Sequence, residues 1–198
     1  ALADGSNGGK ASNYKITLTS DDHAYTVTQK SLGLSGSKVY DGTDVVLASE
    51  LPTITGLIGS ETVVPGSQTI TSGSTATKKN VANNVTITSN AAGITLADGA
   101  NGGLAANYTL TGGTHQVNIT KAPVTIGLTR QYDGTTNVVS NDITLVGEVT
   151  GESITITGPG SVSDKNVGSG KTINTTGLSL ADDTSNASNY SLSSGTFA

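Results

Sequence analysis

The chain has 198 residues with a net charge of −5, only 13% charged residues, 34% apolar residues and no cysteine, tryptophan or methionine. With no basic stripe to displace counterions, nucleic acid and anionic membrane surfaces are disfavoured as partners. Without cysteine, disulfides, thiol catalysis and cysteine-based zinc sites are excluded, and no apolar run is long enough to span a bilayer.

Short segments with alternating apolar and polar residues dominate the chain. In chain order they are 25–28, 84–88, 116–120, 124–128 and 153–157. This alternation is typical of strands with one buried face, and clusters of Gly, Asn, Asp and Ser between them indicate turns. Only 45–51 could form a helical turn or two. We predict an all-β fold of Ig-like β-sandwich repeats arranged end to end, with a parallel β-helix or β-grasp-like repeats as alternatives.

The sequence also repeats itself with a domain-sized period. The segment VYDGT at 39–43 returns as QYDGT at 131–135, which places Tyr132 92 positions after Tyr40. Leu-Ala-Asp occurs at 2–4, 96–98 and 180–182, and Asn-Tyr occurs at 13–14, 107–108 and 189–190. We therefore divide the chain into the C-terminal part of a preceding repeat (1–30), a complete repeat (31–121) and a second repeat (122–198). Residues 1–30 could instead be half of a permuted domain.

The connection between the two repeats is short. It runs through 119–124, and no Gly/Ser-rich or Pro-rich tether lies there. A short connection of this kind limits the swing of one repeat against the next.

Candidate sites for ions and phosphates do not persist between the copies. The oxygen-rich loops 4–9 and 98–103 offer one carboxylate each, and the third copy has lost its glycines. Calcium needs several carboxylates, so a turn is favoured and calcium stays a minor alternative. The segment 168–172 resembles a phosphate loop, but Lys165 stands where the first glycine is needed and no helix is predicted to follow.

The remaining polar candidates also favour structural roles. His23 and His115 occupy near-equivalent positions where the third copy has Phe197, which indicates a packing or edge position. Tyr40 and Tyr132 are expected to cover the end of the core, with carbohydrate or protein contact as the alternative. The pairs Lys79-Asn80 and Lys165-Asn166 suggest exposed turns, with a Lys–Asn crosslink as the alternative. We predict no catalytic, cofactor-binding or metal-binding residue and no enzyme activity.

Several of these segments together match one known family. They are KVYDGT at 38–43, QYDGTT at 131–136, DKNVG at 164–168, ITKA at 119–122 and the Asn-Tyr anchors. In this combination the chain resembles the tandem YDG repeats of filamentous-haemagglutinin-like bacterial surface adhesins. The first copy departs from the pattern at 79–82, where the glycine is missing. The resemblance implies a secreted or cell-surface location and a stalk or adhesive role, and it carries over no catalytic residue.

The expected function is therefore mechanical. We predict stalk or spacer repeats of a large surface or secreted adhesin that project a distal adhesive region, with neighbouring repeats of the same chain as partners. In one alternative, the repeats themselves bind host or matrix glycan or protein. In another, they form an accessory module of a larger exoenzyme. No cofactor, nucleic acid or membrane insertion is expected.

Overall fold

The computed structural model describes residues 3–4, 10–13, 26–65, 79–87 and 94–193. In this part of the chain, all regular structure is β-strand apart from short 3₁₀ turns, which confirms the predicted all-β repeat fold. The described residues include no helix that is long and apolar enough to cross a membrane.

The first repeat is built around a four-stranded sheet. The strands of this repeat are β1 (Lys30–Ser31), β2 (Gly33–Val39), β3 (Thr53–Thr55), β4 (Val63–Pro65), β5 (Ala82–Thr86), β6 (Leu96–Asp98), β7 (Tyr108–Thr109) and β8 (His115–Thr120). The sheet has the order β3-β2-β8-β5, in which β2 and β8 are parallel and the other pairs antiparallel. Smaller pairs join β1 to β7 and β4 to β6. On β8, alternate side chains are buried, as the apolar alternation predicts.

The second repeat follows the same plan. Its strands are β9 (Ala122–Leu128), β10 (Asn137–Val138), β11 (Ile143–Val146), β12 (Ile154–Thr157), β13 (Gly160–Val162), β14 (Ile173–Asn174), β15 (Ser179–Asp182) and β16 (Tyr190–Leu192). The sheet β11-β9-β16 pairs β9 with β16 in parallel, just as β1 pairs with β7, and β12 pairs with β15 as β4 does with β6. The repeat found in the sequence is therefore a repeat of strand pairing.

Five 3₁₀ turns complete the described structure. They are η1 (Ala11–Asn13), η2 (Ala48–Glu50), η3 (Ala105–Asn107), η4 (Ser140–Asp142) and η5 (Ala187–Asn189). The turn η2 falls inside the segment 45–51 for which a helical turn was expected. The turns η1, η3 and η5 each end at the Asn of an Asn-Tyr anchor, so the anchors also mark equivalent places in the fold.

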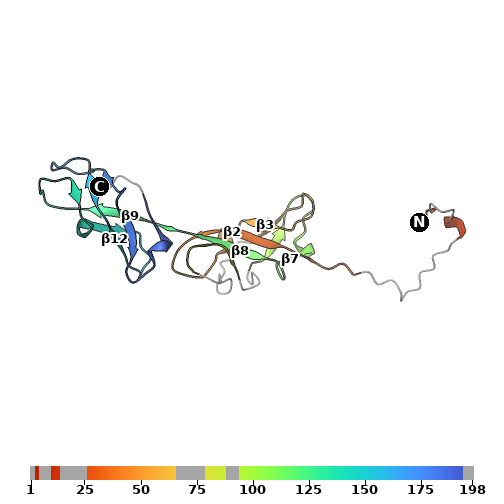
Figure 1. Cartoon of the computed structure of the whole chain (residues 1–198). Helices are drawn as coiled ribbons and strands as arrows, with labels where there is room; N and C mark the ends of the chain where they lie inside the picture. Colours follow the sequence, from red (N-terminus) through yellow and green to blue (C-terminus); the bar gives the residue numbers. More distant parts are fainter. Residues whose placement is uncertain (1–2, 5–9, 14–25, 66–78, 88–93, 194–198) are drawn as a thin grey trace.

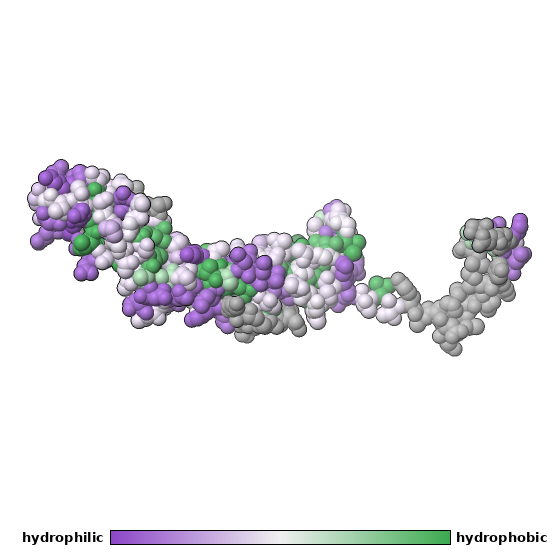
Figure 2. Space-filling model, in the orientation of Figure 1, coloured by the Kyte–Doolittle hydropathy of each residue, from purple (hydrophilic) through white to green (hydrophobic). Residues whose placement is uncertain are grey.

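The hydrophobic core is built from Val, Ile and Leu, and it continues from one repeat into the other. The larger cluster joins Leu32, Tyr40 and Ile119 of the first repeat to Val124 and Tyr190 of the second. A smaller cluster lies within the second repeat. Burial of such side chains contributes about 1.5–3 kcal/mol each. On the visible surface, hydrophobic residues are confined to small patches (Figure 2).

The two repeats lie end to end and are joined by an almost continuous extended segment (Figure 1). Strand β8 ends at Thr120, and β9 begins at Ala122. Only Lys121 separates the two strands, so the chain passes between the repeats without a flexible linker.

Candidate functional site at the joint between the repeats

The Tyr-Asp-Gly-Thr motif of the first repeat forms a tight turn directly after β2. The Asp41 carboxylate accepts hydrogen bonds from the backbone N–H and the hydroxyl of Thr43, both at 2.9 Å. Gly42 has φ +76°, which glycine adopts without strain. Asp and Gly therefore have the turn-forming roles that the sequence predicts.

A buried lysine holds this turn in place. Lys38 is 3% exposed, and its Nζ lies 2.9 Å from Asp41 Oδ1 and donates to the carbonyls of Thr43 and Val45. Desolvation by burial opposes ionisation of Asp41, but the hydrogen bonds from Lys38 and Thr43 outweigh it and lower the pKa of this carboxyl. The turn is therefore stabilised by the Lys38–Asp41 ion pair as well as by the hydrogen bonds within it.

The second copy of the turn is closed in the same way. Asp133 accepts from the backbone N–H of Thr135 at 2.8 Å, and Arg130 lies 2.8 Å from the same carboxylate. The backbone hydrogen bond of Thr135, with the charge of Arg130, lowers the pKa of Asp133. Sequence reasoning missed this cation, although a basic residue stands two positions before the tyrosine in both copies.

Parallel pairing brings the motif tyrosine to the point where the chain enters the second repeat. Val39 at the end of β2 is paired with Thr120 at the end of β8. The next residue, Tyr40, donates its backbone N–H to the Thr120 carbonyl at 2.8 Å. Its side chain is only 4% exposed. Tyr40 therefore covers the end of its own core and also reaches the neighbouring repeat.

Three side chains meet there to form what we call the Tyr–Glu–Tyr joint: Tyr40, Glu152 and Tyr190. Tyr190 begins β16, next to Ala122 of β9, and its ring lies edge-on to that of Tyr40 with centroids 5.6 Å apart. Glu152 accepts the Tyr40 hydroxyl at 2.6 Å on Oε1 and the Tyr190 hydroxyl at 2.5 Å on Oε2. One carboxylate thus binds a tyrosine from each repeat.

An asparagine makes a second contact across the joint. Asn189 is 1% exposed; its side-chain oxygen accepts from the Val81 N–H at 3.0 Å, and its amide donates to the Asn80 side chain at 3.1 Å. These bonds satisfy a buried polar side chain. Of the pair Lys79-Asn80, Asn80 thus accepts a hydrogen bond from Asn189, and Lys79 is exposed. The lysine that is buried in this repeat is Lys38.

Sequence reasoning missed Glu152 as the centre of the joint. The signal was present, because Gly-Glu at 151–152 corresponds to Gly-Ser-Glu at 59–61 in the other repeat. In the first repeat, Glu61 binds the Tyr108 hydroxyl just as Glu152 binds that of Tyr190. A glutamate that recurs about 20 positions after the motif tyrosine is therefore a further anchor of the repeat.

The joint should weaken at alkaline pH. Burial and the hydrogen bond to Glu152 raise the pKa of Tyr40, and likewise that of Tyr190, from 10.0 to about 12. Because the folded-state pKa exceeds the unfolded value, the stabilisation is complete below pH 10 and is lost as the pH rises from 10 to about 12. Urea unfolding across this range should show a steeper loss of stability in the wild type than in Tyr40→Phe. Parallel curves for the two proteins would contradict the assignment.

Gly42 is required by the neighbouring repeat as well as by its own turn. A Cβ at this position would lie 2.9 Å from Val149 Cγ1 and 3.2 Å from Glu152 Oε1, whereas a Cβ at Gly134 would meet nothing closer than 3.9 Å. Both glycines have positive φ. We therefore expect Gly42→Ala to destabilise the chain by about 1 kcal/mol more than Gly134→Ala in urea unfolding. Equal losses would show that the close approach costs nothing.

The recurring Leu-Ala-Asp anchor stabilises the 3₁₀ turns. The carboxylate of Asp4 accepts the N–H of Ala11 at 2.7 Å, and those of Asp98 and Asp182 accept equivalent N–H groups at 2.8 and 2.7 Å. These carboxylates thus cap orphan backbone donors. Within the described ranges, no group of three or more His, Asp or Glu residues could hold a metal ion. Residues 5–9 of the first loop lie outside these ranges.

The remaining sequence candidates that the structure describes do not come together in a chemical site. His115 is buried in β8 with its Nε2 2.9 Å from the Leu110 carbonyl, which fits a packing position. Tyr14, His23 and Phe197 lie outside the described residues. Lys171, in the segment compared with a phosphate loop, pairs with Asp164 at 2.6 Å.

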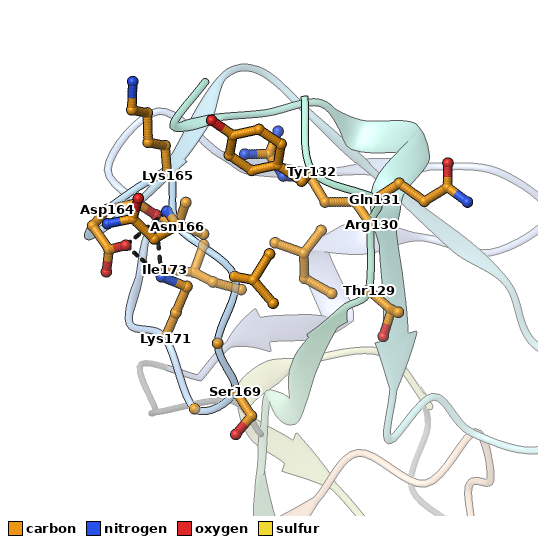
Figure 3. Close-up of a pocket in the computed structure, with 15 residues that line it drawn as sticks. Thr129, Arg130, Gln131, Tyr132, Asp164, Lys165, Asn166, Ser169, Lys171 and Ile173 are labelled. Carbon is orange, nitrogen blue, oxygen red and sulfur yellow. Dashed lines mark hydrogen bonds and ion pairs between the residues drawn. The ribbon is translucent and has the colours of Figure 1, made fainter. Parts of the chain in front are cut away.

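The far end of the second repeat carries an open surface around the second YDG turn. A cavity of about 310 Å³ lies there, lined by 128–132, which lead from the end of β9 to the turn, and by residues between 162 and 173. Tyr132, Arg130 and Asn166 lie around it (Figure 3). Tyr132 is 61% exposed, in contrast to the buried Tyr40.

Comparison with known proteins agrees with the repeat found in the sequence and the fold. The YDG domain family matches residues 23–116 and again 114–197. Neither the curated proteins nor the solved structures gave a match. The two matches together cover most of the chain and overlap at residues 114–116, where β8 begins. The chain belongs to the YDG domain family, with two YDG domains in tandem.

Proposed function

We propose that these repeats form a stalk segment of a large, secreted or cell-surface bacterial adhesin of the filamentous-haemagglutinin-like type. In this role they project a distal adhesive region from the cell. The observation that carries the proposal is the Tyr–Glu–Tyr joint, in which Glu152 binds a tyrosine from each repeat.

The mechanism is resistance to bending. A stalk holds its distal end away from the cell only if neighbouring repeats keep a fixed orientation, since a flexible linker would let them fold back on each other. Here a single residue, Lys121, lies between β8 and β9. Beside this connection, the joint and the Asn189 contacts tie the repeats together at points away from the covalent link. Side chains from both repeats pack in one cluster around it.

The test is a distance distribution between spin labels on the two repeats. The chain has no cysteine, so Val64→Cys and Val167→Cys, at side chains 52% and 89% exposed, would be the only labelled sites. Electron–electron resonance should give one narrow distance. Adding Tyr40→Ala should broaden it, and adding Tyr132→Ala should not. A broad distribution in the otherwise unchanged chain would contradict a stiff stalk.

Binding of host or matrix glycan by the repeats is the alternative, and the geometry decides where to test it. Tyr40 is buried in the joint and Tyr132 is exposed beside the cavity, so a glycan array should compare the wild type with Tyr132→Ala. Binding that Tyr132→Ala abolishes would favour this alternative over a pure spacer.

A further inference from the structure

We propose that the open surface around Tyr132 is the docking site for the N-terminal end of a following YDG repeat. The inference rests on the proposed stalk function and specifies how the stalk is extended. Each repeat would carry a tyrosine end that inserts and a Tyr–Glu end that receives, so that repeats add head to tail.

The surface around Tyr132 carries the same groups that the first repeat brings to the joint. Tyr132 corresponds to Tyr40 and follows an equivalent charged turn. Asn166 and Val167 correspond to Asn80 and Val81, which bond to Asn189 across the joint. The two ends differ in strand pairing and in exposure. In the first repeat β8 pairs with β2 and with β5, whereas among the described residues no strand takes the place of β8 beside β9. Val167 is 89% exposed where Val81 is half-buried.

The receiving end is also present twice. In the first repeat the Tyr108 hydroxyl donates to Glu61 Oε2 at 2.5 Å and accepts the Ile58 N–H at 3.3 Å. These contacts match those of Tyr190 with Glu152 Oε2 and with the Val149 N–H. Asn107, which corresponds to Asn189, is exposed. Among the described residues, the Tyr–Glu pair thus forms with no Tyr40 equivalent docked on it, so its geometry does not depend on a partner.

The two ends are complementary in chemistry. At the joint, a neutral hydroxyl from one repeat meets a carboxylate already bound by a tyrosine of the next. Gly42 allows Val149 and Glu152 to approach, and Gly134 leaves the same space open at the far end. A following YDG repeat is therefore the occupant whose shape and hydrogen-bonding groups the chain itself displays.

The experiment lengthens the chain by one repeat. Residue 196 is followed by a second copy of 115–198, so that the added copy's His115 replaces Phe197. The inner repeat carries Val167→Cys as the only thiol, and its alkylation rate by iodoacetamide is measured. Because residues 115–120 form β8 beside β2 and β5 in the first repeat, the reference is a short chain that ends after the added copy's residues 115–121 and carries the same substitution. We expect a rate about tenfold lower in the extended chain than in this short chain, because docking of the added repeat would cover the thiol.

Two controls make the result specific. Val146, 60% exposed, ends β11 and is paired with Thr125 in the middle of β9, away from Tyr132, so the alkylation rate of Val146→Cys should be the same in both chains. Glu152→Ala in the added copy alone should restore fast alkylation of Val167→Cys. Circular dichroism should show that each extended chain is folded.

Equal alkylation rates for Val167→Cys in the short and the extended chain would overturn the docking proposal. The stalk function is judged separately, by the label distances within the 198-residue chain. If the label distance is narrow but the Val167→Cys thiol is unprotected in the extended chain, the result supports the stalk function and contradicts the docking site. Protection that persists when the added copy carries Glu152→Ala would also count against it, because the thiol would be covered by another contact.

Discussion

We expect Tyr40→Ala to lower the free energy of unfolding by about 3 kcal/mol or more, the range for truncation of a large buried aromatic side chain. The ring is 4% exposed and packs edge-on against Tyr190, and its hydroxyl is bound to Glu152. Removing it leaves a cavity between the repeats and exposes apolar surface on both. Urea unfolding monitored by circular dichroism measures the loss.

Tyr132→Ala is the matched control for this experiment. It removes the same residue from the same motif, but the side chain is 61% exposed, so the loss should stay within about 0.5 kcal/mol. Because stability in repeat arrays includes a term for each interface between neighbours, Tyr40→Ala should also separate the unfolding of the two repeats. Similar losses for both substitutions would mean that the motif tyrosine stabilises only its own turn.

Most of the fold could be predicted from local pattern. Strand β12 (Ile154–Thr157) lies within the alternating segment 153–157, and β8 (His115–Thr120) covers the alternating segment 116–120, because one-sided burial imposes a period of two on any half-buried strand. The alternation at 25–28 was misleading, because residues 26–28 form no strand. The Asp-Gly turn is equally local, since Asp41 bonds to Thr43 two residues later. Such features depend on neighbours in sequence and therefore leave a signature there.

The joint could not be predicted in the same way. Tyr40 binds Glu152, 112 positions along the chain, and nothing in the local pattern of either residue indicates this pairing. An alignment of the copies relates each anchor to its equivalent in the other repeat, but it gives no contact between the repeats. Tyr40 and Tyr132 have the same motif but opposite exposure. Tyr40 lies beside β8 of its own repeat and packs against Tyr190 of the next, and the described part of the chain gives Tyr132 neither neighbour. The parallel pairing of β2 with β8, which brings Tyr40 to the joint, is also long-range.

Some of the repeated residues make contacts both within their own repeat and with the neighbouring repeat. Asn189 ends a 3₁₀ turn in its own repeat and also bonds to Asn80 and Val81 of the other. Gly42 allows a turn and leaves room for Val149. The same few positions therefore stabilise the repeat and set its orientation to the next, so a substitution at one of them should affect stability and stiffness together.

Glu152→Ala should have the second largest effect, a loss of about 3 kcal/mol in the free energy of unfolding. The carboxylate accepts two tyrosine hydroxyls, and hydrogen bonds to charged groups contribute about 1.5–3 kcal/mol each. Tyr190 keeps the Val149 N–H as a donor but loses its acceptor, and Tyr40 loses the carboxylate to which its hydroxyl donates. Urea unfolding measures the loss of stability, and the distribution of spin-label distances between the repeats should broaden, as is expected for Tyr40→Ala.

Glu61→Ala separates the cost of a lost tyrosine contact from the cost of a lost joint. Glu61 binds Tyr108 within one repeat, so its removal should cost about half as much and should leave the distance between the repeats narrow. If Glu61→Ala and Glu152→Ala were equally destabilising, the bond between Glu152 and Tyr40 would add nothing. The repeats would then be held together by the β8–β9 connection and by packing alone, and the carboxylate would serve only the tyrosine of its own domain.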